Sequence, residues 1–563
     1  MPTKQITTQF GHSLAPEGPH TITFHVPGWD SIVAFRAGDP AILSQMRSIY
    51  PRFGPFFEAR ELAAAIHAKL GLSESQGVLP FVDPAAFALA GEYAFSKHRA
   101  EGQRLVRGEL GFRVVDVGGV RVFVVVYPMA KMKGVIGIWQ NQGYGVSTRL
   151  GAELLKSVEG MRVVEWEGVG GEGEGLEGFP EATYLPEGEA HRELRERIVG
   201  LLKRAAVGGG EGGVEAGDVF LEPTGMAAVW RLYRGLASVR KGAVVALGAI
   251  FHSSWHLFEE AEGGFKHFGD VGEGVVDRLE EYVQGEKAEG RDVSFVFLEF
   301  PSNPLLESID LKKLRALADK YGFPLVVDDT VGSFCNVDVL PVADVLISSL
   351  TKSFSGYANV MGGSITLNPS SSHYPLFKPT FTSIFHNLLY EADATQLLHN
   401  SADYLSRSTI LNRNALALAT FFHSHSRAIR PSSPLTKVLY PPFLTTLPNY
   451  KAFMRPATDE FTPGYGCLLS IDFITEKAAR AFYEAVRLHK SPHLGAHETL
   501  VLNFNECAWG DNKELAEYQA SFGAKMDQVR ISVGLEDADL LVGTVKAALE
   551  VAEAAENAEA NGV

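Results

Sequence analysis

From residue 219 to about residue 369 the chain alternates short apolar runs with amphipathic stretches. The runs are apolar at consecutive positions, which is typical of strands buried on both faces of a parallel sheet. They span residues 243–250, 293–300, 324–329 and 345–350. Between two of them, Leu311, Leu314 and Leu317 recur at helical spacing, with Ser308 expected as the N-cap and Gly322 as the helix end. The pattern predicts βαβ units and therefore a mostly parallel sheet covered by helices.

The pattern changes on either side of this segment. Upstream, two strand-like runs around Gly118 and Gly119 predict a hairpin, and helices are expected over 55–70 and 145–158. Downstream, a helical stretch over 387–425 precedes strand candidates at 467–474 and 528–533 and a closing helix at 542–558. Gly- and Glu-rich stretches at 167–178 and 207–217 predict loops or linkers around a charged helical segment at 181–206. We therefore expect an N-terminal α+β extension (1–205), a large α/β domain (206–425) and a smaller C-terminal α/β domain (426–563).

Composition narrows the possible partners. The 563 residues carry a formal charge of -16, which argues against a nucleic-acid partner, because phosphates need a basic surface. The longest apolar run, near residues 122–127, is far shorter than the roughly 18 residues of a membrane span. The N-terminus has no apolar signal-peptide core, so no membrane partner and a cytoplasmic location are expected. The three cysteines form no CxxC pair, which favours a reducing compartment and predicts no metal site.

Two of the buried runs end in polar side chains that could take part in catalysis. PLVVDDT contains Asp328, and DVLISSLTK ends at Lys352 after Ser349 and Thr351. A lysine at the end of a buried strand reaches its neutral amine form more easily than a solvated one and can form a Schiff base. Asp328 could pair with the protonated ring nitrogen of pyridoxal phosphate (PLP), and the two hydroxyls would suit its phosphate. Taken alone, a lysine in this position is more often a solvated strand end.

These segments, with the continuation FSGYANVMGGSITLNP, resemble the fold-type-I PLP-dependent enzymes of the Cys/Met metabolism family, and among them most closely the fungal cystathionine γ-synthases. Acid, hydroxyls, lysine and glycines recur in order over about 45 residues, which makes the match specific. The resemblance covers roughly residues 180–563 at motif level. It implies PLP bound to Lys352, small amino-acid substrates, and a homodimer or homotetramer with sites at subunit boundaries. The N-terminal third resembles the fungal extension through SIYPRFGPF and IGIWQNQGYGVSTRL but has no assigned chemistry.

The resemblance also assigns further cofactor contacts. Gly225 and Met226, which open a helix after VFLEPT, would receive the phosphate. Phe251 stands where relatives usually have a tyrosine that stacks on the cofactor ring, so it keeps the aromatic face and lacks the hydroxyl. Asn303, in EFPSNP, would donate to the cofactor's phenolic oxygen or to substrate, although Asn before Pro is also a common turn.

Two residues are implied on the substrate side. Arg530, in VRISVG, would hold the substrate α-carboxylate. His493 stands where many relatives carry serine and could alter substrate choice.

The phosphate clamp is the main departure from the family pattern. Relatives supply a tyrosine and an arginine from a neighbouring subunit. Here the aligned tyrosine is Tyr184, but Pro186 replaces the arginine, and Tyr50 and Arg52 of YPRFGPF are possible substitutes far upstream.

The implied reaction is γ-replacement on an O-acylhomoserine with cysteine, giving cystathionine for methionine biosynthesis. A γ-lyase, an O-acylhomoserine sulfhydrylase and a γ-substituting enzyme of secondary metabolism would use the same core residues, and the fold does not separate them. Pro186, Phe251 and His493 also leave open a non-catalytic regulatory relative.

Overall fold

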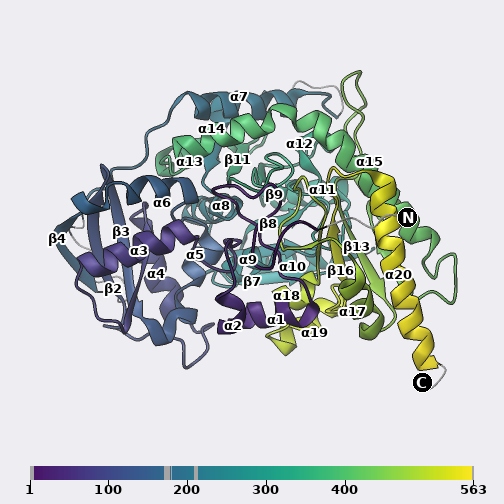
Figure 1. Cartoon of the computed structure of the whole chain (residues 1–563). Helices are drawn as coiled ribbons and strands as arrows, with labels where there is room; N and C mark the ends of the chain where they lie inside the picture. Colours follow the sequence, from purple (N-terminus) through teal and green to yellow (C-terminus); the bar gives the residue numbers. More distant parts are fainter. Residues whose placement is uncertain (1–5, 170–177, 179, 208–212, 561–563) are drawn as a thin grey trace.

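The computed structural model describes residues 6–169, 178, 180–207 and 213–560, and these form three sheets surrounded by helices (Figure 1). One sheet falls in each of the three expected segments of the chain. The Gly- and Glu-rich stretches expected as loops lie mostly outside the described residues. Within the described part of the chain, no helix has the length and apolar character needed to cross a lipid bilayer.

The N-terminal sheet is antiparallel, with four strands in the order β1-β3-β2-β4. Its strands are β1 (Gln76–Phe81), β2 (Gly111–Val117), β3 (Val120–Pro128) and β4 (Arg162–Val169). The predicted hairpin is confirmed, because Gly118 and Gly119 join β2 to β3 with φ of 58° and 79°, values that favour glycine. Helices α3 (Phe57–Lys69) and α4 (Ala85–Phe95) pack on this sheet, and α6 (Thr148–Leu155) packs on α3. Helix α5 (Gly137–Gln142) packs on α4, α8 (Gly225–Val239) and α9 (His252–Phe258).

The central sheet has seven strands in the order β5-β11-β10-β9-β8-β6-β7. They are β5 (Val219–Glu222), β6 (Ala243–Leu247), β7 (Phe265–Phe268), β8 (Val293–Glu299), β9 (Leu325–Asp328), β10 (Val345–Ser348) and β11 (Gly363–Leu367). Only β11 runs against its neighbours, so the predicted mostly parallel sheet is confirmed. Its helices are α7 (Glu189–Lys203), α8 (Gly225–Val239), α9 (His252–Phe258), α10 (Val275–Ala288), α11 (Leu311–Tyr321), α12 (Ser333–Asn336), α13 (Tyr374–Ile384) and α14 (Glu391–Asn400).

The two ends of helix α11 test the capping residues predicted from the sequence. Its predicted end is confirmed, because Gly322 has a φ of 73° and closes the helix. The predicted N-cap, Ser308, is wrong. Asp310 caps the helix instead, and its carboxylate accepts from the amides of Lys312 and Lys313 at 3.1 Å each. Ser308 lies two residues too early for its hydroxyl to reach the first-turn amides.

The C-terminal sheet has five strands in the order β12-β13-β16-β15-β14 and is antiparallel except for the last pair. The strands are β12 (Leu435–Leu439), β13 (Leu468–Phe473), β14 (His489–Lys490), β15 (Leu500–Leu502) and β16 (Val529–Ser532). The accompanying helices are α15 (Tyr404–Ser424), α16 (Leu447–Lys451), α17 (Glu476–Ala485), α18 (Phe504–Trp509), α19 (Lys513–Ser521) and α20 (Ala538–Ala560).

Part of the first 55 residues packs on the C-terminal domain rather than on the sheet that follows it in sequence. Helices α1 (Trp29–Ala37) and α2 (Pro40–Leu43) belong to this segment, and Phe24 and Phe35 share a hydrophobic cluster with Leu502 and Phe504. This packing carries the segment across the middle of the molecule and brings residues 50–52 to the central sheet (Figure 1). Helix α7 packs on α14 and β5, so it lies with the central sheet although the expected boundary is near residue 205.

Candidate active site

The carboxyl ends of β9 and β10 meet at one edge of the central sheet. The two strands are parallel, and Ile347 of β10 lies opposite Asp328 of β9. A cavity of about 90 Å³ lies beyond this edge. Its walls include most of the site residues expected from the sequence: Gly225, Met226, Phe251, Asn303, Asp328, Ser349, Thr351, Lys352 and Arg530. The structure therefore gathers these residues, which lie between positions 225 and 530 of the chain, around one small space.

Lys352 is held by a residue from the N-terminal segment. Its Nζ donates a hydrogen bond to the hydroxyl of Tyr50 at 2.7 Å and lies 4.9 Å from the centre of the tyrosine ring. Burial lowers the pKa of the Lys352 ammonium, and the nearby guanidinium groups of Arg530 and Arg52 lower it further, while Tyr50 opposes the shift. The amine is thus more often neutral than a solvated lysine and is anchored in one direction.

The pKa of Tyr50 shifts for the complementary reason. Burial alone would raise it, but the positive charges of Lys352 and Arg52 outweigh burial, and the pKa of the phenol is lowered. The same contact, in which the Tyr50 oxygen accepts from Lys352 Nζ, thus shifts the pKa values of both groups.

Two carboxyl groups lie side by side on neighbouring strands. Glu299 of β8 is in register with Asp328 of β9. Glu299 accepts from the amides of Phe251 at 2.6 Å and Asn303 at 3.2 Å, whereas Asp328 accepts from the amide of Thr330 at 2.9 Å. Burial, with the charge of Asp328, raises the pKa of Glu299 well above its usual value, and burial raises the pKa of Asp328 to about 6. Of the two carboxyl groups, Asp328 therefore ionises more readily, and Glu299 fixes the backbone around Phe251 and Asn303.

Sequence reasoning missed this role of Glu299. The EFPSNP motif was interpreted through Asn303 alone. The missing signal was that both EFPSNP and PLVVDDT place an acid at the end of a buried strand, and adjacent parallel strands bring such ends together.

The first turn of α8 forms another wall. Thr224 caps the helix, accepting from the amide of Ala227 at 2.9 Å, and its hydroxyl donates to the carbonyl of Gly143 at 3.1 Å. A Cβ on Gly225 would lie 2.8 Å from the Cβ and Oγ of Ser349, so only glycine allows this close approach. The amides that open the helix are suited to an anion.

The Thr351 hydroxyl is committed to the backbone, whereas Arg52 lies where a substitute for the clamp arginine is expected. The Thr351 hydroxyl exchanges hydrogen bonds with the backbone of Gly362 at 3.1 Å in both directions, so it stabilises the loop rather than projecting a free donor. Arg52 lines the cavity, and its Nη1 is buried without a hydrogen-bond partner. A buried, unpaired guanidinium nitrogen beside a helix N-terminus fits a phosphate.

Arg530 is fixed at the other side of the cavity. Its Nη1 donates to Asn303 Oδ1 at 3.1 Å, its Nη2 donates to the carbonyl of Pro492 at 2.7 Å, and its guanidinium lies 4.0 Å from the centre of the Phe504 ring. In this structure Asn303 therefore contacts Arg530.

His493 is buried between two residues that line the cavity, Pro492 and Leu494, but does not line it itself. Its ring centre is 5.8 Å from that of Tyr50, and neither ring nitrogen has a hydrogen-bond partner. Burial, and then the charge of Lys352, lowers the pKa of His493 well below its usual value, so the imidazole is neutral.

Tyr184 is not brought to this cavity within one chain. It stacks on His386, with ring centres 4.0 Å apart, and lines a separate and larger cavity. Tyr50 and Arg52, the upstream substitutes, lie in the Lys352 cavity instead.

The gathered residues fit PLP. Lys352 offers an amine for an aldehyde, Asp328 a carboxylate for a ring nitrogen, Phe251 an aromatic face, and the start of α8 with Arg52 a phosphate site. The unpartnered Nη1 of Arg52 is the clearest sign, because an isolated buried cation is costly unless an anion joins it.

Comparisons with known proteins agree with this assignment. A family model for the Cys/Met metabolism PLP-dependent enzymes matches residues 211–550. The cystathionine gamma-synthase-like enzyme iboG1 of Amanita muscaria is 32% identical over 97% of this chain and 98% of its own. The alanine racemase ungC of Aspergillus violaceofuscus is 30% identical over 95% of this chain and 96% of its own.

A solved structure supports the fold. Cystathionine gamma synthase from Xanthomonas oryzae pv. oryzae, in complex with aminoacrylate and cysteine, superposes with a TM-score of 0.52 at 23% identity. The match covers 68% of this chain and 91% of that one. The fold predicted from the motifs, fold type I, is confirmed.

Proposed function

Because the chain belongs to the Cys/Met metabolism family of PLP-dependent enzymes, we propose that it catalyses γ-replacement on an O-acylhomoserine with L-cysteine as the acceptor, giving cystathionine. The observation that carries the proposal is the Lys352 cavity, in which an anchored amine, a carboxylate and a fixed arginine face one small space. In the overall reaction the Cγ–O bond breaks and a carboxylate leaves. A Cγ–S bond forms, and the thiol proton is released.

PLP supplies the electron sink that makes hydrogens at Cα and Cβ acidic. Lys352 would hold it and then act as the base and acid at those carbons, for which its lowered pKa is suited. Asp328 would stay ionised against the ring nitrogen. The start of α8, Ser349 and Arg52 would bind the phosphate.

Tyr50 and Arg530 would set the geometry. The 2.7 Å hydrogen bond from Lys352 to Tyr50 fixes the direction of the amine. This orientation lowers the entropic cost of reaching a geometry in which the proton can be transferred. Arg530, held by Asn303 and Pro492, would grip the substrate α-carboxylate and so orient Cα toward Lys352.

A second candidate is exchange of the Cα proton alone. It is favoured by one specific finding, that an alanine racemase is 30% identical over 95% of this chain. Racemisation uses the same lysine and cofactor but needs no leaving group at Cγ.

The test is product analysis of the holoenzyme with O-acetyl- or O-succinyl-L-homoserine, with cysteine, with sulfide, and without a nucleophile. Cystathionine formed only with cysteine supports the proposal. Homocysteine from sulfide at the higher rate would make it a sulfhydrylase, and ammonia with a keto acid would make it a lyase. Cα deuterium exchange of L-alanine without any replacement product would favour the racemase. Lys352→Ala should abolish every activity.

We also expect a homodimer or homotetramer. Light scattering on the holoenzyme tests this, and a monomer at micromolar concentration would contradict it.

A further inference from the structure

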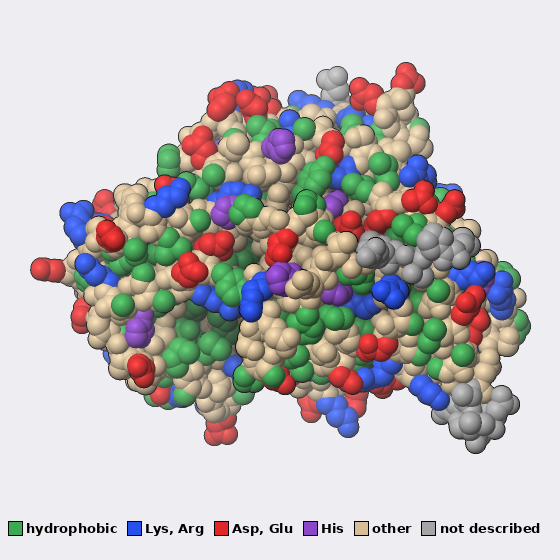
Figure 2. Space-filling model, viewed as in Figure 1, with side chains coloured by type: hydrophobic (Ala, Val, Ile, Leu, Met, Phe, Trp, Pro, Cys, Tyr) green, Lys and Arg blue, Asp and Glu red, His purple; other side chains and the backbone are tan. Residues whose placement is uncertain are grey.

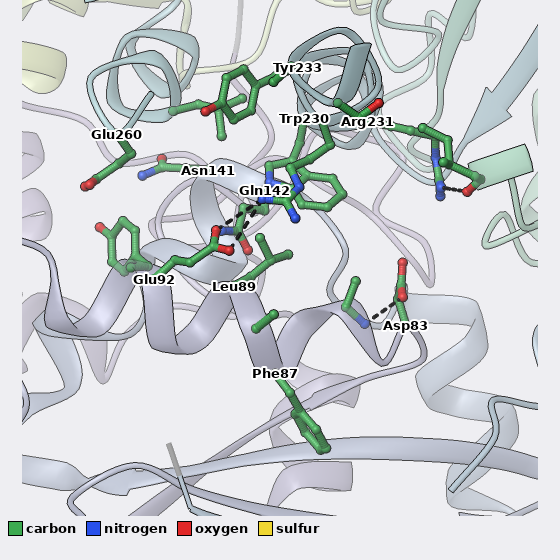
Figure 3. A pocket seen from close by; sticks show the side chains of 18 of the residues that line it. Asp83, Phe87, Leu89, Glu92, Asn141, Gln142, Trp230, Arg231, Tyr233 and Glu260 are labelled. Carbon is green, nitrogen blue, oxygen red and sulfur yellow. Dashed lines mark hydrogen bonds and ion pairs between the residues drawn. The ribbon is translucent and has the colours of Figure 1, made fainter. Parts of the chain in front are cut away.

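A second cavity, much larger than the one that contains Lys352, lies elsewhere in the described chain. It has a volume of about 830 Å³, compared with about 90 Å³ for the Lys352 cavity, and no described residue lines both. It lies between α4 and the end of α5 on one side and α8 and α9 on the other, so its walls come from the N-terminal extension and from the central domain (Figure 3). The visible face of the molecule is hollowed near these helices, and hydrophobic side chains line the hollow (Figure 2). Sites for small molecules are common at such domain boundaries and fall in this range of volume.

Two of its walls carry buried hydrogen-bonding groups that are not fully used. Gln142 is 6% exposed, and its Oε1 is buried with no hydrogen-bond partner. Asp83 is also 6% exposed and accepts from the amide of Ala85 at 2.9 Å, but it forms no ion pair with any described residue. Buried polar atoms are normally satisfied, so Gln142 Oε1 points to a missing partner, and Asp83 adds to the same cavity a carboxylate that has no ion pair. Figure 3 shows Gln142 near the middle of the view, with Asp83 on one side and Glu260 on the other.

Of the three Lys and Arg side chains that line the cavity, Arg231 and Arg234 are already paired, and Lys241 is exposed to solvent. Arg231 binds the carboxylate of Glu222 and donates to the carbonyl of Ile384 at 2.7 Å. Arg234 pairs with Glu92 at 3.4 Å. The carboxylate of Asp83 therefore remains as the buried charge without a salt-bridge partner in this part of the structure. Burial raises the pKa of Asp83, although the amide of Ala85 and the charges of Arg231 and His386 oppose the shift.

The charge and the hydrogen-bonding groups of the cavity walls indicate the class of ligand that the cavity binds. A buried carboxylate is best satisfied by a cation with N–H donors. The Gln142 amide can turn its oxygen or its nitrogen to the ligand, so Asp83 decides the charge. Trp230, Tyr233 and the Tyr184–His386 stack supply aromatic surface for the body of the ligand.

We propose that this cavity is a binding site for a small organic cation, which places its N–H donors against Asp83 and Gln142 and its apolar body against Trp230 and Tyr233. The site is distinct from the Lys352 cavity but touches the same helix. Gly225 and Met226, at the start of α8, line the Lys352 cavity, whereas Trp230 and Arg231, one turn later, line this one.

Benzamidine is a suitable probe because its amidinium cannot condense with an aldehyde cofactor as a primary amine would, and benzamide is its neutral counterpart of the same shape. Isothermal titration of the holoenzyme should show one benzamidine bound per chain and at least tenfold weaker binding of benzamide. Asp83→Asn should weaken benzamidine binding at least tenfold, the effect of losing one charge-assisted hydrogen bond. Glu262→Gln, which neutralises an exposed acid at the same cavity, should change it less than twofold.

Hydrogen–deuterium exchange on the wild-type holoenzyme provides a measurement that does not depend on a variant folding. Benzamidine should protect peptides that cover residues 83–95 and 225–239 and leave the peptide that contains Lys352 unchanged. The proposal is overturned by an absence of saturable benzamidine binding, by equal affinity for benzamide, or by protection confined to the Lys352 peptide. Failure of these tests leaves the γ-replacement assay unaffected, since that assay reports on the other cavity.

Discussion

Tyr50→Phe removes one hydroxyl and tests whether the N-terminal segment completes the lysine site. The wild-type hydroxyl accepts from Lys352 Nζ at 2.7 Å and stabilises the ammonium form of the lysine. Phenylalanine keeps the ring beneath the amine and removes only the acceptor. We therefore expect the pKa of Lys352, already lowered by burial, to fall further.

The size of the effect follows from the kind of hydrogen bond. A hydrogen bond to a charged group contributes about 1.5–3 kcal/mol, and because Lys352 is only partly buried we take the lower end, about 1.5 kcal/mol. Since one pKa unit corresponds to about 1.4 kcal/mol, the pKa of the lysine should fall by about one unit.

Reductive methylation of the apoenzyme with formaldehyde, followed by mass spectrometry of the Lys352 peptide, measures this shift. The pH at which the amine becomes half-reactive should be about one unit lower in Tyr50→Phe than in the wild type. Tyr184→Phe is the matched control, because the sequence offers Tyr184 as the alternative tyrosine, and it should leave the midpoint unchanged. An unchanged midpoint in Tyr50→Phe, or a shift in Tyr184→Phe, would refute the reasoning.

Three further changes test the remaining walls of the cavity. Without the cofactor the pKa of Asp328 is about 6, and pairing with a protonated ring nitrogen lowers this pKa. PLP affinity should therefore be constant above about pH 6 and decline as the pH falls through that value. Equilibrium dialysis measures this dependence, and Asp328→Asn should remove it. Gly225→Ala places a Cβ 2.8 Å from Ser349 and should cost about 1–3 kcal/mol in chemical denaturation while weakening PLP binding; full stability would show that α8 can shift freely. Arg530→Lys loses the two-pronged grip and should raise the KM for the amino-acid substrate about tenfold or more with a smaller change in kcat; an unchanged KM would remove Arg530 from substrate binding.

The central sheet and its two main site residues were predictable because their signals are local. The four predicted strands, β6, β8, β9 and β10, are largely apolar runs. Asp328 ends β9, and Lys352 follows shortly after β10. Parallel pairing then brings the two ends to one edge without further information.

The contribution of Tyr50 was not predictable with the same certainty, because it depends on tertiary packing. The segment before residue 55 reaches the site through contacts of Phe24 and Phe35 with Leu502 and Phe504, more than 450 positions away. Motif alignment favoured Tyr184, which instead stacks on His386 within the same chain. The large cavity that Tyr184 lines was not predictable either, since its walls come from the N-terminal extension and from the central domain.

The most direct measurement of the central claim is borohydride reduction of the holoenzyme followed by peptide mapping. The account predicts a phosphopyridoxyl group on Lys352 and no label in Lys352→Ala. A label on another lysine, with position 352 unmodified, would contradict it.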